Sequence, residues 1–125
     1  MLSARLRAFL AESEELIPAA VAALEDGDLD AFGRLAERSQ RNARDNLGNQ
    51  VRETIRMQAL ARDLGAQAAS SFGAGFGGSV WALVPTADAD DFATAWLERY
   101  SAEFPEAAER ATTLITRPGG PAHRL

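Results

Sequence analysis

The chain has 125 residues, and this length together with 46% hydrophobic and 25% charged residues fits one globular domain and excludes a disordered chain. Its formal net charge of −5 disfavours nucleic acid as a partner. The absence of both cysteine and lysine excludes disulfides, thiolate metal sites, cysteine nucleophiles, Schiff bases and lysine-dependent phosphate loops.

Residues 4–25 form the first predicted element, in which apolar residues recur at helical spacing: Leu6, Phe9, Leu10, Leu16, Ile17, Val21 and Leu24. Pro18 interrupts this pattern and predicts a kink or two short helices. Arginines and glutamates are mixed at the N-terminus, and no apolar run is long enough for a bilayer. We therefore expect no signal peptide, no membrane contact and a cytoplasmic location.

A second helix is predicted to begin at Asp28, whose side chain suits an N-cap, and to stop near Gly48. Four arginines recur along it at helical spacing: Arg34, Arg38, Arg41 and Arg44. We interpret them as a solvated helix face, because Glu37 and Asp45 lie nearby and the chain as a whole is acidic.

The rest of the chain predicts a helix, two strands, another helix and a third strand, in that order. A third helix is expected over about 51–64, a weak strand over 66–72 and a strong strand over 79–85. A helix over 88–104 follows, with aspartates in its first turn and aromatic residues on one face, and a third strand over 111–118. Trp81 and Trp96 are expected in the core, and the single histidine, His123, is expected to be solvated rather than a metal ligand.

This order of elements predicts an α+β domain over residues 1–125, with helices packed on one face of a small antiparallel sheet. A ferredoxin-like (split βαβ) layout has four strands, and the sequence supplies three. The missing strand would precede the first helix. Its absence would leave an unpaired sheet edge at which another segment could dock.

Residues 73–78 read GAGFGG, a glycine-rich loop that fits more than one binding motif. A dinucleotide-binding G-x-G-x-x-G opens a helix, whereas SVWALVP follows here and predicts a strand. The protein-kinase and Walker loops both depend on a lysine, which the chain lacks. Two interpretations stay open: glycines that permit a tight turn, or successive backbone N–H groups that form an anion-binding nest.

The segment GAQAASSFGAGFGGSVWALVP resembles the third motif of the GHMP small-molecule kinases, and most closely that of galactokinases. Residues 73–78 match the family's G-A-G-F-G-G core position by position. The stretch AALEDGDLDAFGRLAERSQRNARD is similar to a helix–turn–helix segment of the family, with Ser39 and Arg44 at its serine and arginine, so the resemblance covers nearly the whole chain.

The sequence also departs from galactokinases at the entrance of the loop. Ser70, Ser71 and Phe72 stand where galactokinases usually have Arg, Met and Thr, and Ser79 stands in place of Cys. Ser70 or Ser71 could replace the lost threonine hydroxyl. The resemblance therefore leaves the identity of the sugar open.

The resemblance implies the C-terminal domain of an ATP-dependent sugar kinase. The family's sugar-recognition motif, P-x-x-x-G-L-S-S-S-A phosphate loop and catalytic aspartate belong to an N-terminal domain that residues 1–125 do not contain. ATP and Mg²⁺ are thus implied for the complete kinase and not for this chain alone, and the implied partners are the N-terminal kinase domain and the sugar. The implied site is a cleft loop without catalytic or metal-ligating residues, formed by Ser70, Ser71, Phe72, Gly73, Ala74, Gly75, Phe76, Gly77 and Gly78.

Two further functions are compatible with the sequence. The chain could be a free-standing, non-catalytic binding or regulatory module that forms a homodimer through its open sheet edge. It could also be one half of a split kinase, with the N-terminal half on another polypeptide.

Overall fold

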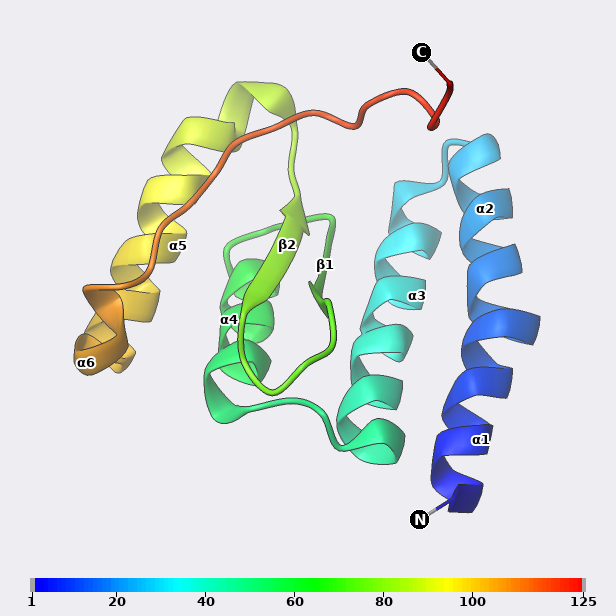
Figure 1. The fold of residues 1–125 in the computed structure, drawn as a ribbon. Helices are drawn as coiled ribbons and strands as arrows, with labels where there is room; N and C mark the ends of the chain where they lie inside the picture. Colours follow the sequence, from blue (N-terminus) through cyan, green and yellow to red (C-terminus); the bar gives the residue numbers. More distant parts are fainter. Residues whose placement is uncertain (1, 125) are drawn as a thin grey trace.

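The computed structural model describes residues 2–124 and begins with one continuous helical rod (Figure 1). The rod consists of α1 (Leu2–Leu10), the π-helical segment η1 (Ala11–Leu16) and α2 (Ile17–Glu25). Helix α3 (Leu29–Asn42) and the π-helical segment η2 (Ala43–Leu47) run back beside it. Pro18 lies in the first turn of α2, where its missing N–H is tolerated, so the predicted interruption takes the form of η1 just before it.

Local sequence signals set the ends of α3 and η2 as predicted. The Asp28 carboxylate accepts a hydrogen bond from the Ala31 N–H at 2.9 Å, which confirms Asp28 as the N-cap. Gly48 follows η2 with a φ of 64°, a left-handed conformation that ends the helix and favours glycine.

Most large apolar residues of the rod point away from the rest of the structure. Leu16 is buried, whereas six others are between 46% and 66% exposed: Leu6, Phe9, Leu10, Ile17, Val21 and Leu24. The face toward α3 is built from small residues such as Ala8, whose carbonyl accepts a hydrogen bond from Asn42 Nδ2 at 3.0 Å. The helical periodicity of this segment was therefore predicted correctly, but its apolar residues do not fill the core.

The sheet is an antiparallel hairpin of β1 (Ala68–Phe72) and β2 (Ser79–Leu83), in which Ala69 lies opposite Ala82 and Phe72 opposite Ser79. Helix α4 (Arg52–Asp63) packs against both strands of the hairpin, and α5 (Ala89–Glu103) packs beside α4 (Figure 1). The core there is formed by Ala61, Ala66 and Ala69, with Phe92 and Trp96 packed against it. This confirms the predicted α+β class with helices packed on a small antiparallel sheet.

Helix α3 packs closely against the start of β1. A side chain at Gly33 would overlap the Gln67 carbonyl oxygen, so only glycine permits this approach. One residue earlier, the Phe32 ring lies 6.1 Å from the Trp81 ring of β2. Helix α3 thus connects the rod to the sheet.

The prediction of a third strand over 111–118 is wrong. After η3 (Thr86–Asp88), α5 and the short α6 (Pro105–Ala108), residues 111–124 form no helix or strand and cross α5 toward the end of α2 (Figure 1). Strands β1 and β2 pair only with each other in the described part of the chain, so this segment has no neighbouring strand to supply hydrogen bonds. Within residues 2–124, no helix has both the length and the apolar character needed to cross a bilayer.

Candidate functional site

The glycine-rich loop at residues 73–78 connects β1 to β2 at one end of the hairpin. Its four glycines all have positive φ, between 85° and 117°. Phe76 has a φ of 61° and is the single non-glycine residue with positive φ among residues 2–124. The glycines are therefore required by the backbone conformation of the loop, which no other residue type adopts at low cost.

Asn49, in the connection between η2 and α4, holds the middle of the loop. Its carbonyl oxygen accepts a hydrogen bond from the Phe76 N–H at 2.5 Å, and its Nδ2 donates to the Ala74 carbonyl at 3.3 Å. Gly75 lies so close to Asn49 that a Cβ at this position would overlap the Asn49 carbonyl oxygen and side chain. Gly75 is thus required both by its φ of 85° and by lack of space.

The loop leaves several backbone donors without a protein acceptor. Among the described residues, the N–H groups of Ala74, Gly75 and Gly77 make no hydrogen bond to the chain. The side chains of Phe72 and Phe76 are 57% and 73% exposed. The loop therefore offers backbone N–H donors and two aromatic rings to a ligand or another domain.

Gln40 of α3 binds the two serines that precede the loop. Its Oε1 accepts hydrogen bonds from the Ser71 N–H at 2.9 Å and the Ser71 hydroxyl at 2.8 Å, and lies 3.3 Å from the Ser70 hydroxyl. Gln40 and Ser70 are both buried. The structure therefore directs both serine hydroxyls toward α3.

A chain of side-chain amide hydrogen bonds extends from Gln40 to Asn49, the residue that holds the middle of the loop. Gln40 Nε2 donates to Gln50 Oε1 at 3.3 Å, and Gln50 Nε2 donates to Asn49 Oδ1 at 3.1 Å. Thr54 of α4 fixes Gln50 from the other side, with its hydroxyl 3.0 Å from Gln50 Oε1. The end of β1 and the middle of the loop are thus linked through residues 40–54, a segment distant from both of them in sequence.

The sequence predicts the loop but not the residues that support it. Gln40 carried a usable signal, because it lies on the same helix face as Gly33 and Ala36, a face of small residues that is buried. A polar residue on a buried face needs a hydrogen-bond partner within the protein. Asn49 and Gln50 lie in a connection and carried no comparable signal.

The residues carried over from the helix–turn–helix resemblance lie on α3 and η2. Ser39 is half-buried on α3. Arg44 pairs with its neighbour Asp45 through contacts of 2.7 and 3.1 Å. This hydrogen bond lowers the pKa of Asp45 below its ordinary value of 3.8, which weakens the carboxylate as a proton acceptor and makes it a poor candidate for a general base.

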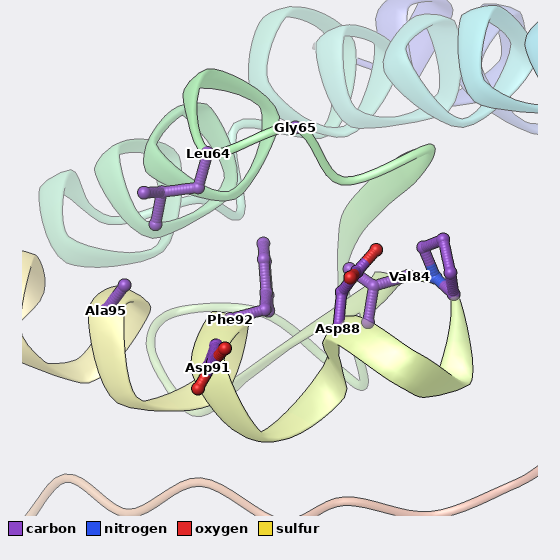
Figure 2. A pocket seen from close by; sticks show the side chains of 8 residues that line it. Leu64, Gly65, Val84, Asp88, Asp91, Phe92 and Ala95 are labelled. Atoms are coloured by element: carbon purple, nitrogen blue, oxygen red, sulfur yellow. The ribbon is translucent and has the colours of Figure 1, made fainter.

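Two hollows in the surface lie away from the loop. One of about 290 Å³ has Leu64, Val84 and Phe92 among its lining residues and lies at the end of β2 opposite the loop (Figure 2). The other, of about 580 Å³, lies between α4 and α5, where Arg56 forms a bidentate ion pair with Glu103 at 2.7 and 2.8 Å. No residue of the loop lines either hollow. The candidate site is therefore the exposed loop itself and not an enclosed pocket.

Comparison with known proteins gives one family. The model of the family described as GHMP kinases C terminal matches residues 20–102, about two thirds of the chain. The matched region contains α3, α4, both strands and the glycine-rich loop. No curated protein matches the chain.

Proposed function

The chain belongs to the GHMP kinase C-terminal family, and from this membership we propose that its glycine-rich loop forms one wall of the cleft of an ATP-dependent, galactokinase-like sugar kinase. The complementary wall, with the catalytic groups, would come from an N-terminal kinase domain on the same or a separate chain. In this proposal the chain binds and orients substrates and does not itself carry the reaction.

The backbone of the loop carries this proposal. The N–H groups of Ala74, Gly75 and Gly77 have no acceptor among the described residues, and φ alternates in sign from Gly73 through Ala74 to Gly75. Such an alternation is typical of anion-binding nests, which hold phosphate with backbone dipoles and need no basic side chain. A phosphate group of ATP therefore fits the donors that the loop offers.

The loop offers donors for a phosphate group, but the described part of this chain offers no comparable set of ligands for a divalent metal ion. When bound, Mg²⁺ would neutralise charge on the transferred phosphoryl group. Residues 2–124 contain no group of three or more His, Asp or Glu side chains that could hold a metal ion. We assign no step to a metal held by this chain, and Mg²⁺ would be bound by the nucleotide and the N-terminal domain.

Phe72 is our candidate for the residue that distinguishes this kinase from galactokinases. The Ser70 and Ser71 hydroxyls are bound to Gln40, whereas the Phe72 ring is exposed beside the loop. An exposed aromatic ring can pack against the apolar face of a sugar. We therefore propose that selectivity for the sugar depends on Phe72 rather than on the serines.

The loop proposal can be tested by titrating ¹⁵N-labelled chain with ATP–Mg²⁺ and with tripolyphosphate. We expect weak binding, with a Kd of about 1 mM or above, and chemical-shift changes concentrated at the amides of Ala74, Gly75 and Gly77. Gly77→Ala should abolish them, because its φ of 117° is strained for alanine. Gly27→Ala is a matched control, since Gly27 also has positive φ and open space around it. Shifts that avoid the loop, or that survive Gly77→Ala unchanged, would contradict the proposal.

A free-standing, non-catalytic interaction module is the second candidate function, favoured by the exposed apolar residues of the rod. Two observations separate it from the kinase. An in-frame P-x-x-x-G-L-S-S-S-A segment upstream of Met1 would support a fused kinase, and such a segment encoded by a neighbouring gene would support a split one. ATP-dependent sugar phosphorylation by the chain alone would contradict both our kinase proposal and the non-catalytic module.

A further inference from the structure

The rod α1–η1–α2 carries an apolar stripe on its exposed face, formed by Leu2, Leu6, Phe9, Ile17, Val21 and Leu24. Each of these side chains is at least 50% exposed. The rod spans residues 2–25, a length of about 36 Å at the usual helical rise. Contiguous exposed apolar surface of this kind marks an interaction site rather than ordinary solvent-facing surface.

The stripe is nearly symmetric about Ser13 in the sequence. Phe9 and Ile17 lie four positions before and after Ser13, and Leu2 and Leu24 lie eleven positions before and after it. Leu6 and Val21 lie seven and eight positions away. A stripe with this symmetry can pack against a second copy of itself in antiparallel orientation, because a two-fold axis at its centre brings each half onto the other.

The centre of the stripe permits close approach of two helices. Ser13 is small, and its hydroxyl donates a hydrogen bond to the Phe9 carbonyl at 2.9 Å within the same helix. The hydroxyl is thus satisfied inside its own helix and can be covered without losing a partner. A small residue at the crossing point allows the interaxial distances of about 8 to 10 Å found between packed helices.

The charges of the rod favour the antiparallel orientation. Arg5 and Arg7 are the charged residues of α1, whereas Glu25 and Asp26 lie at the end of α2. Antiparallel packing places the basic end of one copy beside the acidic end of the other and also aligns the helix dipoles favourably. A parallel arrangement would bring like charges together at both ends.

The acidic residues near the centre oppose this pairing less than their number suggests. Glu15 pairs with Arg38 of its own chain at 3.2 Å. Glu12 accepts a hydrogen bond from Asn42 of its own chain at 3.1 Å. Both carboxylates are therefore directed toward α3 and away from the stripe, whereas Glu14 is exposed beside Ser13 and its charge near the axis weakens the dimer.

We propose that the chain forms a homodimer in which the apolar stripes of two copies pack antiparallel about a two-fold axis at Ser13. This interface differs from the open sheet edge expected from sequence. We expect this interface to bury less than the roughly 1,200 Å² of the smallest standard interfaces, because one helix of each copy forms it, and we therefore expect the dimer to dissociate on dilution.

Sedimentation equilibrium over about 1 µM to about 1 mM protein tests the oligomeric state. We expect a reversible monomer–dimer equilibrium, which Phe9→Glu and Ile17→Glu each shift to monomer. Both side chains are exposed, so circular dichroism should show intact folding. Leu114→Glu is the matched control, because Leu114 is apolar and 88% exposed but lies in the C-terminal tail. A wild-type monomer throughout would overturn the proposal and would leave the stripe to a different partner, such as an N-terminal kinase domain.

Cross-linking tests the geometry, since the chain has no cysteine of its own. Under mild oxidation, Ser13→Cys should form a disulfide-linked dimer with itself. Leu6→Cys and Val21→Cys should cross-link when mixed and much less when alone, whereas a parallel dimer would give the reverse. Thr94→Cys, exposed on α5, should not cross-link. Equal cross-linking of Thr94→Cys and Ser13→Cys, or none by Ser13→Cys at concentrations where the dimer forms, would overturn the two-fold axis.

Discussion

The glycine-rich loop and the apolar stripe are both exposed, but different parts of the chain determine them. The loop is defined by its backbone: positive φ angles, N–H groups without an acceptor, and two backbone groups that hydrogen-bond to Asn49. The stripe has a regular helical backbone and is defined by its side chains. Substitutions in the loop should therefore alter folding, whereas substitutions in the stripe should alter association and leave folding intact.

The largest expected effect comes from comparing the two faces of the rod at adjacent positions. Ala8→Glu places a charge at a residue that is 1% exposed, and should lower the free energy of unfolding by about 4 kcal/mol. Phe9→Glu lies on the exposed face and should change it by about 0.5 kcal/mol or less. Urea denaturation at protein concentrations below the dimer's dissociation constant measures the unfolding free energies of both variants. Equal losses would mean that the rod is not oriented as described.

Within the loop, alanine substitutions at two glycines distinguish the cost of backbone strain from the cost of a steric clash. Gly73 has a φ of 87° and open space around it, so Gly73→Ala introduces backbone strain alone and should lower the free energy of unfolding by about 1 kcal/mol. Gly75→Ala has a similar φ and also collides with Asn49, so it should cost about 3 kcal/mol. Denaturation midpoints give the difference. If the two variants were equally stable, the close contact with Asn49 would not be required.

Removal of the amide that binds the two serines should have a smaller effect. Gln40→Leu leaves the Ser71 N–H without its acceptor and should cost about 2 kcal/mol. Amide hydrogen exchange at Ser71 should accelerate, which a general loss of packing would not do selectively. Arg41→Leu, at the exposed neighbouring position, is the control and should leave this exchange rate unchanged.

The smallest expected effect concerns the charge pair that precedes Asn49. Arg44→Gln removes the hydrogen bond that lowers the pKa of Asp45, so this pKa should rise toward 3.8. Because the folded-state pKa is depressed, the pair stabilises the protein above the ordinary pKa, and the contribution disappears as the pH falls through the lowered value. Carboxyl ¹³C titration measures the change. Loop amide shifts at neutral pH should stay in place, unlike those of Gln40→Leu.

Structural features that depend on residues close in sequence were predicted correctly. Features that depend on contacts between residues distant in sequence were not. Asp28 and Gly48 act on their own helix ends, and both were predicted correctly. The weak strand signal at 66–72 gives β1 because Ser79–Leu83 lies opposite, whereas the richer signal at 111–118 gives no strand because no neighbour pairs with it. Strand formation thus required knowledge of tertiary contacts that propensity does not contain.

At the candidate site, too, the features set by single residues were predictable and those set by distant contacts were not. The positions that need positive φ were visible as glycines, because only glycine adopts that conformation freely. Their support by Gln40 and Asn49 joins residues 25 or more positions apart in the sequence, and the pattern of a single sequence does not show such pairs.

The π-helical segment η1 also has a consequence for how this helix tolerates insertions and deletions. A π-helical turn holds one more residue than an α-helical turn, as if one residue had been added within Ala11–Leu16. Deleting one residue there would give a regular α-helical turn, and α1 would keep nearly the same rotation relative to α2 because the π-helical turn already holds the extra residue. Ala8 would then stay beside Asn42, and the two halves of the exposed face would still line up. The same deletion in a regular α-helical part of the rod would rotate everything before it by about 100°. A one-residue deletion within η1 should therefore be much less damaging than one elsewhere in the rod.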